Sequence, residues 1–308
     1  MAITRRELIT GIATAGVPAA VAVSVGSYPL KGEEIAVPSA AVGLLYDATI
    51  CIGCKACVAA CAEANDTPPD TRGDQLHQAP TDLNDVTRNI IKLYKEEDGS
   101  AFSYVKRQCM QCLDPACAAG CPFQALHKDP ESGVVRWDSD KCIGCRYCTI
   151  TCPYHIPRFQ WQGYNPRVTK CELCSHRLAQ GLKPGCSSVC PTGAVIFGPR
   201  SALLMEAKRR IQASPGRYFE NRVYGEHDNG GTQALYLSKV PFEKLGLPVL
   251  GTESVPAKTL RWQHRLYQYF ALPAVLYAGL VAVIRKNLTG HEQEAHEREK
   301  ETGLRAQL

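Results

Sequence analysis

Sixteen cysteines, all between residues 51 and 190, are the side chains of this sequence best able to do chemistry. In chain order they form four groups: Cys51, Cys54, Cys57 and Cys61; Cys109, Cys112, Cys117 and Cys121; Cys142, Cys145, Cys148 and Cys152; Cys171, Cys174, Cys186 and Cys190. The first and third groups share the string Cys-Ile-Gly-Cys, and the last three groups end in Cys-Pro. This self-similarity indicates a duplicated unit that contains two groups.

The spacing suits a cubic 4Fe–4S cluster, whose four iron corners each take one thiolate. Three cysteines at two-residue gaps can lie on one tight loop and reach three corners of a cube. The fourth cysteine is expected to start a helix that points away and to serve a neighbouring cluster, as in two-cluster bacterial ferredoxins. Gly53 and Gly144 suit such a loop because its backbone must approach sulfur closely. The sequence therefore predicts four 4Fe–4S clusters.

The segment between the second and third groups predicts which groups share clusters. It reads as a short helix followed by a hairpin around Gly133, and it is similar to the linker of a two-cluster bacterial ferredoxin. We therefore pair the second group with the third and, by elimination, the first with the fourth. The expected ligand sets are Cys51, Cys54, Cys57 with Cys190; Cys171, Cys174, Cys186 with Cys61; Cys109, Cys112, Cys117 with Cys152; and Cys142, Cys145, Cys148 with Cys121.

Other uses of cysteine fit the sequence less well. Zinc also takes four thiolates, and the isolated pair Cys171 and Cys174 would suit it, so a zinc-stapled interaction scaffold is the alternative from a different class. The regular spacing disfavours disulfides, and no Cys-x-x-Cys-His string for covalent haem occurs. No phosphate-binding loop, dinucleotide fingerprint or spare nucleophilic cysteine is present. The chain is expected to carry electrons without being an enzyme.

The remaining sequence must position these groups in an α+β fold of two ferredoxin-like 4Fe–4S modules related by a pseudo-twofold repeat. The four-cluster domain is expected over residues 43–200. Within it, residues 62–108 form an insertion rich in Asp, Pro and Thr that resembles a loop packed on a partner. Residues 201–262 are an extension that starts with a helix, for which Ser201 is the expected N-cap.

Charge excludes one class of partner. The 308 residues carry a formal net charge of +5 without a dense basic run, so nucleic acid is not an expected partner. Positive side chains near the cysteines are candidates for neutralising the clusters: Lys55, Arg107, Arg146 and Lys170.

Both ends of the chain suggest export and a membrane. Residues 1–30 contain Arg5-Arg6 before a weakly apolar stretch and resemble a twin-arginine signal segment, which exports proteins already folded around their cofactors. Residues 266–284 are nineteen residues without charge, long enough as a helix for about 28 Å. They predict a single transmembrane helix followed by a charged tail over 287–308. The expected location is the periplasmic side of the cytoplasmic membrane.

The order of the motifs resembles a known family over about residues 43–250: the electron-transfer subunits of molybdopterin oxidoreductases and of membrane-bound nickel–iron hydrogenases. The hydrogenase subunits are the more similar, and the shared features are Leu44-Leu45-Tyr46-Asp47, Tyr147-Cys148, Lys170-Cys171-Glu172-Leu173-Cys174 and Gly230-Gly231-Thr232-Gln233. The resemblance implies the nested ligand sets given above. It also implies an electron relay with two ends. One end is the hydrogenase dimer of small and large subunits, and the other is an integral-membrane quinone-binding subunit. The alternative is the β subunit of a formate dehydrogenase or another molybdopterin oxidoreductase.

Overall fold

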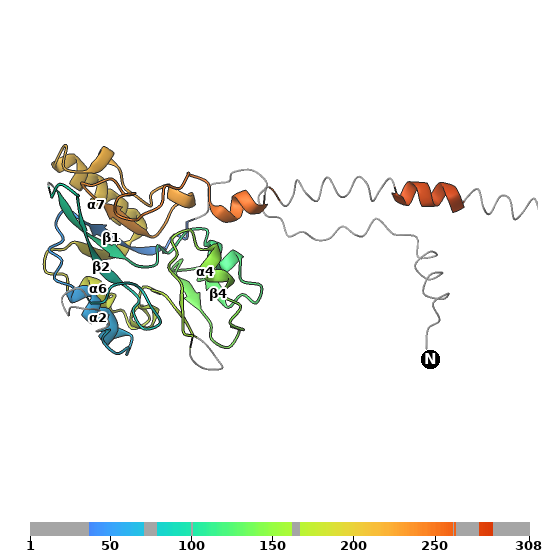
Figure 1. Ribbon diagram of the computed structural model, residues 1–308, viewed down its shortest axis with the longest axis horizontal. Helices are drawn as coiled ribbons and strands as arrows, with labels where there is room; N and C mark the ends of the chain where they lie inside the picture. The colour runs from blue at the N-terminus through green and yellow to red at the C-terminus, as the bar shows by residue number, and fades with distance from the viewer. Residues whose placement is uncertain are drawn as a thin grey trace, which may run out of the picture. The chain divides into compact units, whose positions relative to one another are not determined.

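The computed structural model describes residues 37–70, 79–99, 101–161, 167–260, 262 and 277–285 (Figure 1). All of them belong to a unit that spans residues 35–308. The signal segment expected over residues 1–30 and the charged tail expected over 287–308 lie outside the described residues.

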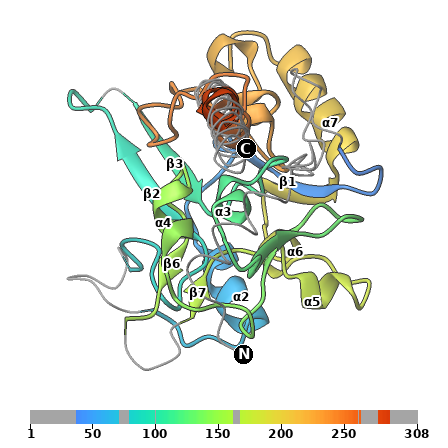
Figure 2. The same cartoon turned by 90° about the vertical axis from the view of Figure 1, so that its right-hand side faces the viewer.

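A three-stranded sheet underlies the described fold, with β1 (Val42–Asp47) in its centre. β1 pairs antiparallel with β8 (Val195–Pro199) and parallel with β9 (Ala234–Leu237), whose four residues are all buried. α7 (Arg200–Ala213) packs against this sheet (Figure 2). The predicted helix is confirmed, but the expected N-cap at Ser201 is wrong: the helix begins two residues earlier, at Arg200, with Pro199 at the N-cap position.

Two pairs of short helices carry five of the sixteen cysteines. α2 (Ala56–Ala64) packs on α6 (Gly185–Ser188), and α3 (Ala116–Ala119) packs on α4 (Tyr147–Thr151). Both contacts are close: a Cβ added at Gly185 would lie 2.6 Å from the carbonyl oxygen of Ala60, and one at Gly120 would lie 2.7 Å from Thr151 Cγ2. Each pair joins helices from different cysteine groups, as a duplicated unit requires.

The hairpin predicted around Gly133 is confirmed as β4 (Leu126–Lys128) and β5 (Val135–Trp137). The short helix expected before it is wrong, because residues 122–125 form a turn that leads directly into β4. The other described elements are β6 (Arg158–Phe159), β7 (Val168–Thr169), α5 (Ser175–Leu178), η2 (Phe219–Asn221) and η3 (Asp228–Gly230).

The inserted segment is a β-hairpin rather than the expected loop. β2 (Ile90–Lys95) pairs antiparallel with β3 (Phe102–Arg107). Two tyrosines fasten β3 to the sheet: the Tyr46 hydroxyl donates to the Tyr104 carbonyl at 2.7 Å, and the Tyr236 hydroxyl donates to the Lys106 carbonyl at 2.9 Å. The hairpin is therefore part of this chain's own core.

The α+β class agrees with the structure, but the transmembrane helix expected over residues 266–284 is wrong for the part of the chain that is described. No helix in that part is long and apolar enough to cross a membrane. Residues 277–285 form a helix of nine residues, which extends only about 14 Å against a hydrocarbon core of about 30 Å. Residues 266–276 of the expected span lie outside the described residues.

A buried carboxylate joins the sheet to α7. Asp47 is fully buried; its Oδ1 accepts from the Thr49 hydroxyl at 2.6 Å, and its Oδ2 accepts from Arg210 Nη1 and the Tyr218 hydroxyl, each at 3.1 Å. We expect Asp47→Ala to lower the free energy of unfolding by about 3 kcal/mol, because it deprives the buried Tyr218 hydroxyl and the half-buried Thr49 and Arg210 of a buried charged acceptor.

The urea midpoint of the cluster-loaded protein measures this effect. The matched control is Glu96→Ala, which removes the surface partner of Lys244 and Tyr94 and should leave the midpoint close to that of the natural protein. Equal midpoints for the two variants would contradict the role assigned to Asp47.

Candidate iron–sulfur sites

Four thiols, from the first and fourth cysteine groups, line one cavity of about 320 Å³ including its mouth. They are Cys51, Cys54, Cys57 and Cys190, and we name this cavity site A. The loop that carries the first two has Gly53 at φ 71°, where a Cβ would lie 2.3 Å from the Tyr104 ring. Lys55 follows at φ 59° as the N-cap of α2. Only such a tight, left-handed loop places three thiols of one short segment around one space.

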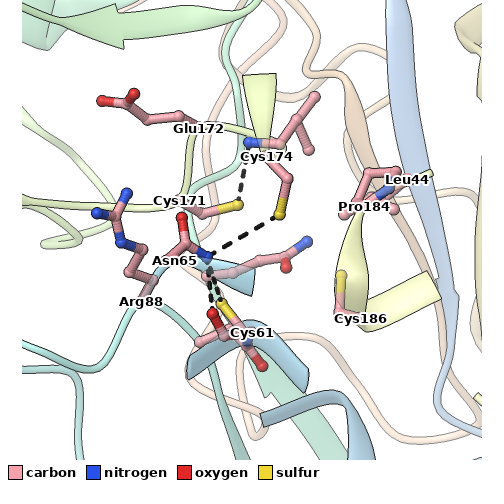
Figure 3. Close-up of a pocket in the computed structure, with 12 residues that line it drawn as sticks. Leu44, Cys61, Asn65, Arg88, Cys171, Glu172, Cys174, Pro184 and Cys186 are labelled. Atoms are coloured by element: carbon pink, nitrogen blue, oxygen red, sulfur yellow. Dashed lines mark hydrogen bonds between the residues drawn. The ribbon is translucent and has the colours of Figure 1, made fainter. Parts of the chain in front are cut away.

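A second cavity, site B, holds about 290 Å³ including its mouth and is lined by the thiols Cys61, Cys171, Cys174 and Cys186 (Figure 3). All four cysteines are buried. The Asn65 side-chain amide points into the site, with its Nδ2 3.6 Å from Cys61 Sγ and 4.0 Å from Cys174 Sγ. The Leu173 N–H donates to Cys171 Sγ at 3.4 Å. Donors of this kind stabilise negative sulfur.

The eight thiols of the second and third groups also gather in two sets. Electrostatic interactions link Cys112 to Cys109, Cys117 and Cys152, which we name site C. They link Cys148 to Cys142, Cys121 and Cys145, which we name site D. At site C, Asn229 repeats the arrangement of Asn65, since its Nδ2 lies 3.7 Å from Cys112 Sγ.

The exchange of cysteines between neighbouring sites has a simple structural origin. α2 carries both Cys57, which lines site A, and Cys61, which lines site B. The expectation that the fourth cysteine starts a helix is wrong: the third cysteine already lies in the first helical turn, at Cys57 in α2 and Cys148 in α4. The helix then carries the chain from one site to the next, and Cys152 is the C-cap of α4.

The chemistry of the thiols fits a multiply charged metal centre. Burial raises the pKa of the thiols of Cys117 and Cys186 to about 12 and that of Cys148 to about 11. Without a cation these groups remain protonated at neutral pH, so thiolate formation needs metal charge and releases protons. Cys190 differs, because its pKa is lowered. Burial alone would raise this pKa, but the N–H of Val195, 3.4 Å from the sulfur, and the Thr192 hydroxyl stabilise the thiolate and lower it.

The candidate neutralising cations occupy different environments. Lys170 is fully buried and acts electrostatically on Cys117, whereas the Arg146 guanidinium stacks 3.9 Å from the centroid of the exposed Trp161 ring. Lys55 donates to the Ala79 carbonyl at 2.8 Å. Sequence reasoning missed Lys106, which is fully buried on β3. No local signal marks it, because lysine in a hairpin normally reaches solvent.

Comparisons with known proteins agree with the cysteine pattern. Models of a 4Fe-4S dicluster domain match residues 50–125 and residues 100–200. Hydrogenase-2 operon protein HybA of Escherichia coli O157:H7 is 39% identical over 278 residues, which cover 80% of this chain and 84% of that protein. This chain belongs to the HybA family.

Formate dehydrogenase iron–sulfur subunits are also similar to this chain. The Haemophilus influenzae protein is 34% identical over 201 residues, which cover 64% of each chain. The formate dehydrogenase-O subunit of Escherichia coli is 36% identical over 201 residues, 64% of this chain and 66% of that one.

Family membership decides between the two uses of the cysteines considered above. This member of the HybA family is an electron-transfer subunit that carries four 4Fe–4S clusters and does not itself catalyse a reaction. The zinc scaffold is therefore set aside. When bound, the clusters supply one-electron storage, while the chain supplies thiolates, N–H donors and burial.

Proposed function

We propose that this chain relays electrons between a nickel–iron hydrogenase, which consists of a small and a large subunit, and an integral-membrane quinone-binding subunit. The similarity to a hydrogenase-2 operon protein over most of both chains supports this choice of partner. The shorter match to formate dehydrogenase subunits supports the alternative, a molybdopterin oxidoreductase partner.

The relay uses sites A to D with the sixteen cysteines as ligands in the nested sets. The two lined cavities support this assignment for sites A and B. The electrostatic links among thiols support it for sites C and D. Each site offers four sulfur ligands, as a 4Fe–4S cube requires.

The thiols also suggest the order of the sites along the path. Cys186 of site B interacts electrostatically with Cys57 of site A. Cys171 of site B interacts with Cys109 of site C. Cys117 of site C interacts with Cys148 of site D. These three interactions support a path that runs through the sites in the order A, B, C, D.

The observation that carries the proposal is that this order begins and ends at the surface. Cys54 at site A and Cys145 at site D are exposed, whereas every cysteine of site B is buried. An exposed isoleucine lies two residues before each exposed cysteine: Ile52 is 58% exposed and Ile143 is 62% exposed. Exposed apolar side chains around a redox centre suit docking of a partner. Electrons would enter at one end and leave at the other.

Purification of the native complex tests the partner. We expect nickel to co-purify with this chain, together with at least sixteen iron atoms per chain, sixteen of them from the four clusters, and the acid-labile sulfide of those clusters. Molybdenum or tungsten in place of nickel would favour the formate dehydrogenase alternative. Iron far below sixteen atoms would contradict the four-cluster relay itself.

We further propose that the chain acts on the periplasmic side after export by the twin-arginine route, on the strength of Arg5-Arg6 in the N-terminal segment. Replacing both arginines by lysine should leave the brown, cluster-loaded protein in the cytoplasm. Cell fractionation followed by immunoblotting measures its location. Unchanged periplasmic protein would argue against this route.

A further inference from the structure

Lys106 is a lysine in the protein interior with an unusual set of neighbours. Its side chain is fully buried, and its Nζ donates to Asn89 Oδ1 at 2.6 Å. Asn89, which is also buried, donates from Nδ2 to the carbonyl of Cys57 at 3.3 Å and lines site B. The ammonium group is thus held by one neutral amide that touches both cysteine sites of this half of the molecule.

The charges that Lys106 faces are thiols. It interacts electrostatically with Cys57 of site A and with Cys186, Cys61 and Cys171 of site B. No carboxylate among the described residues forms an ion pair with it. A buried ammonium is stable only beside negative charge. Here the ligands of two clusters supply that charge.

In the other half of the path, each described lysine near site C also faces a carboxylate. Lys128 interacts electrostatically with Cys112 and with Asp114, and it donates to the Leu113 carbonyl. Lys170, the buried lysine near site C, lies 3.8 Å from Glu172 Oε1 and donates to the backbone carbonyl of Val135. Its charge is therefore partly compensated. At site D, Arg146 stacks on exposed Trp161, where solvent screens its charge. Lys106 makes the surroundings of sites A and B more positive than those of site D.

We propose that Lys106 tunes the reduction potentials of two clusters. Its fixed positive charge raises the potentials of sites A and B above those that the thiolate ligands alone would give. The inference rests on the ligand sets proposed above. Reduction adds one electron and no proton, so the charge of a site becomes more negative by one. The buried ammonium stabilises that added charge because little solvent screens it. The transferred electron is thereby favoured in the half of the path that ends at Cys54.

A redox titration of the full complex, followed by electron paramagnetic resonance, tests this inference with Lys106→Met, which removes the charge and keeps the side-chain length. We expect two of the four one-electron steps to move to lower potential. At a fixed ambient potential the ratio of reduced to oxidised cluster should fall about tenfold at those sites, which corresponds to 59 mV for one electron. The two steps of sites C and D should remain in place, as internal controls.

Asn89→Asp is the second variant, because it leaves Lys106 in position and neutralises it with a nearly isosteric carboxylate. It should lower the reduction potentials of the same two steps. If Lys106→Met binds less iron than the natural protein, the potentials of Asn89→Asp test the inference in its place. Lys106→Arg, which keeps the charge, should leave the potentials close to those of the natural protein. Four loaded clusters with unmoved steps, or an equal shift of all four, would overturn the inference. Fewer than four clusters in the natural protein would instead overturn the proposed function.

Discussion

Replacing Cys142 by serine should reduce hydrogen-dependent quinone reduction by the complex at least roughly tenfold, while hydrogen oxidation with a soluble dye continues. Cys142 belongs to site D, which contains the exposed Cys145 and forms one end of the proposed path. Serine is a poor ligand for iron in a cube, so the variant should lose or convert one cluster. The dye accepts electrons from the catalytic dimer and does not need the far end of the path.

The two activities are measured on the same preparation, together with iron and acid-labile sulfide. Ser139→Ala is the matched control, since Ser139 is an exposed residue three positions before Cys142 and makes a hydrogen bond only to neighbouring Asp140 among the described contacts of its side chain. It should leave both activities unchanged. An equal loss of dye-linked activity in Cys142→Ser would show that the chain does more than conduct electrons away from the catalytic dimer.

Removal of iron should unfold the two cysteine-bearing helix pairs. The largest apolar cluster of the fold contains thiols from three of the four sites, among them Cys57, Cys109 and Cys186. Without metal these side chains surround empty cavities and can no longer hold their loops together. We expect a chelator under reducing conditions to abolish amide-exchange protection in α2, α3, α4 and α6.

The layer formed by the central sheet and α7 provides an internal control. Its apolar cluster contains Leu45, Leu203, Ala207 and Leu235 and includes no cysteine. It should therefore retain more exchange protection than the helix pairs in the same sample. Uniform protection in the iron-free chain would show that the clusters do not hold the fold together. Refolding upon restoration of iron and sulfide completes the experiment.

Much of the site could be predicted because its signal is local. The gaps of two and three residues between cysteines come from the geometry of one loop and one helical turn, so they are visible without knowledge of the fold. Gly53 and Gly144 were expected in close-approach loops, and both adopt positive φ, 71° and 73°. The helix predicted after Ser201 rests on apolar residues repeating at helical spacing along its own length, and it exists, although it begins at Arg200.

Features that depend on long-range contacts could not be predicted. The β2–β3 hairpin joins the core through tyrosines on β1 and β9, which are far away in the sequence. Lys106 lies on β3 of that hairpin and is fully buried where β3 packs against the core. A charge-free run also proved insufficient evidence for a membrane span, since composition gives only the length available to a helix and the described helices are all too short to span the hydrocarbon core.

The two cysteines of α2 bear on how this protein matures. This one helix carries Cys57, which lines site A, and Cys61, which lines site B. Assembling the first cofactor therefore immobilises a thiol that the second one needs, and damage to either loosens its neighbour. Maturation within each module should be nearly all-or-none, so a cell would contain complete or empty modules and few that are half filled.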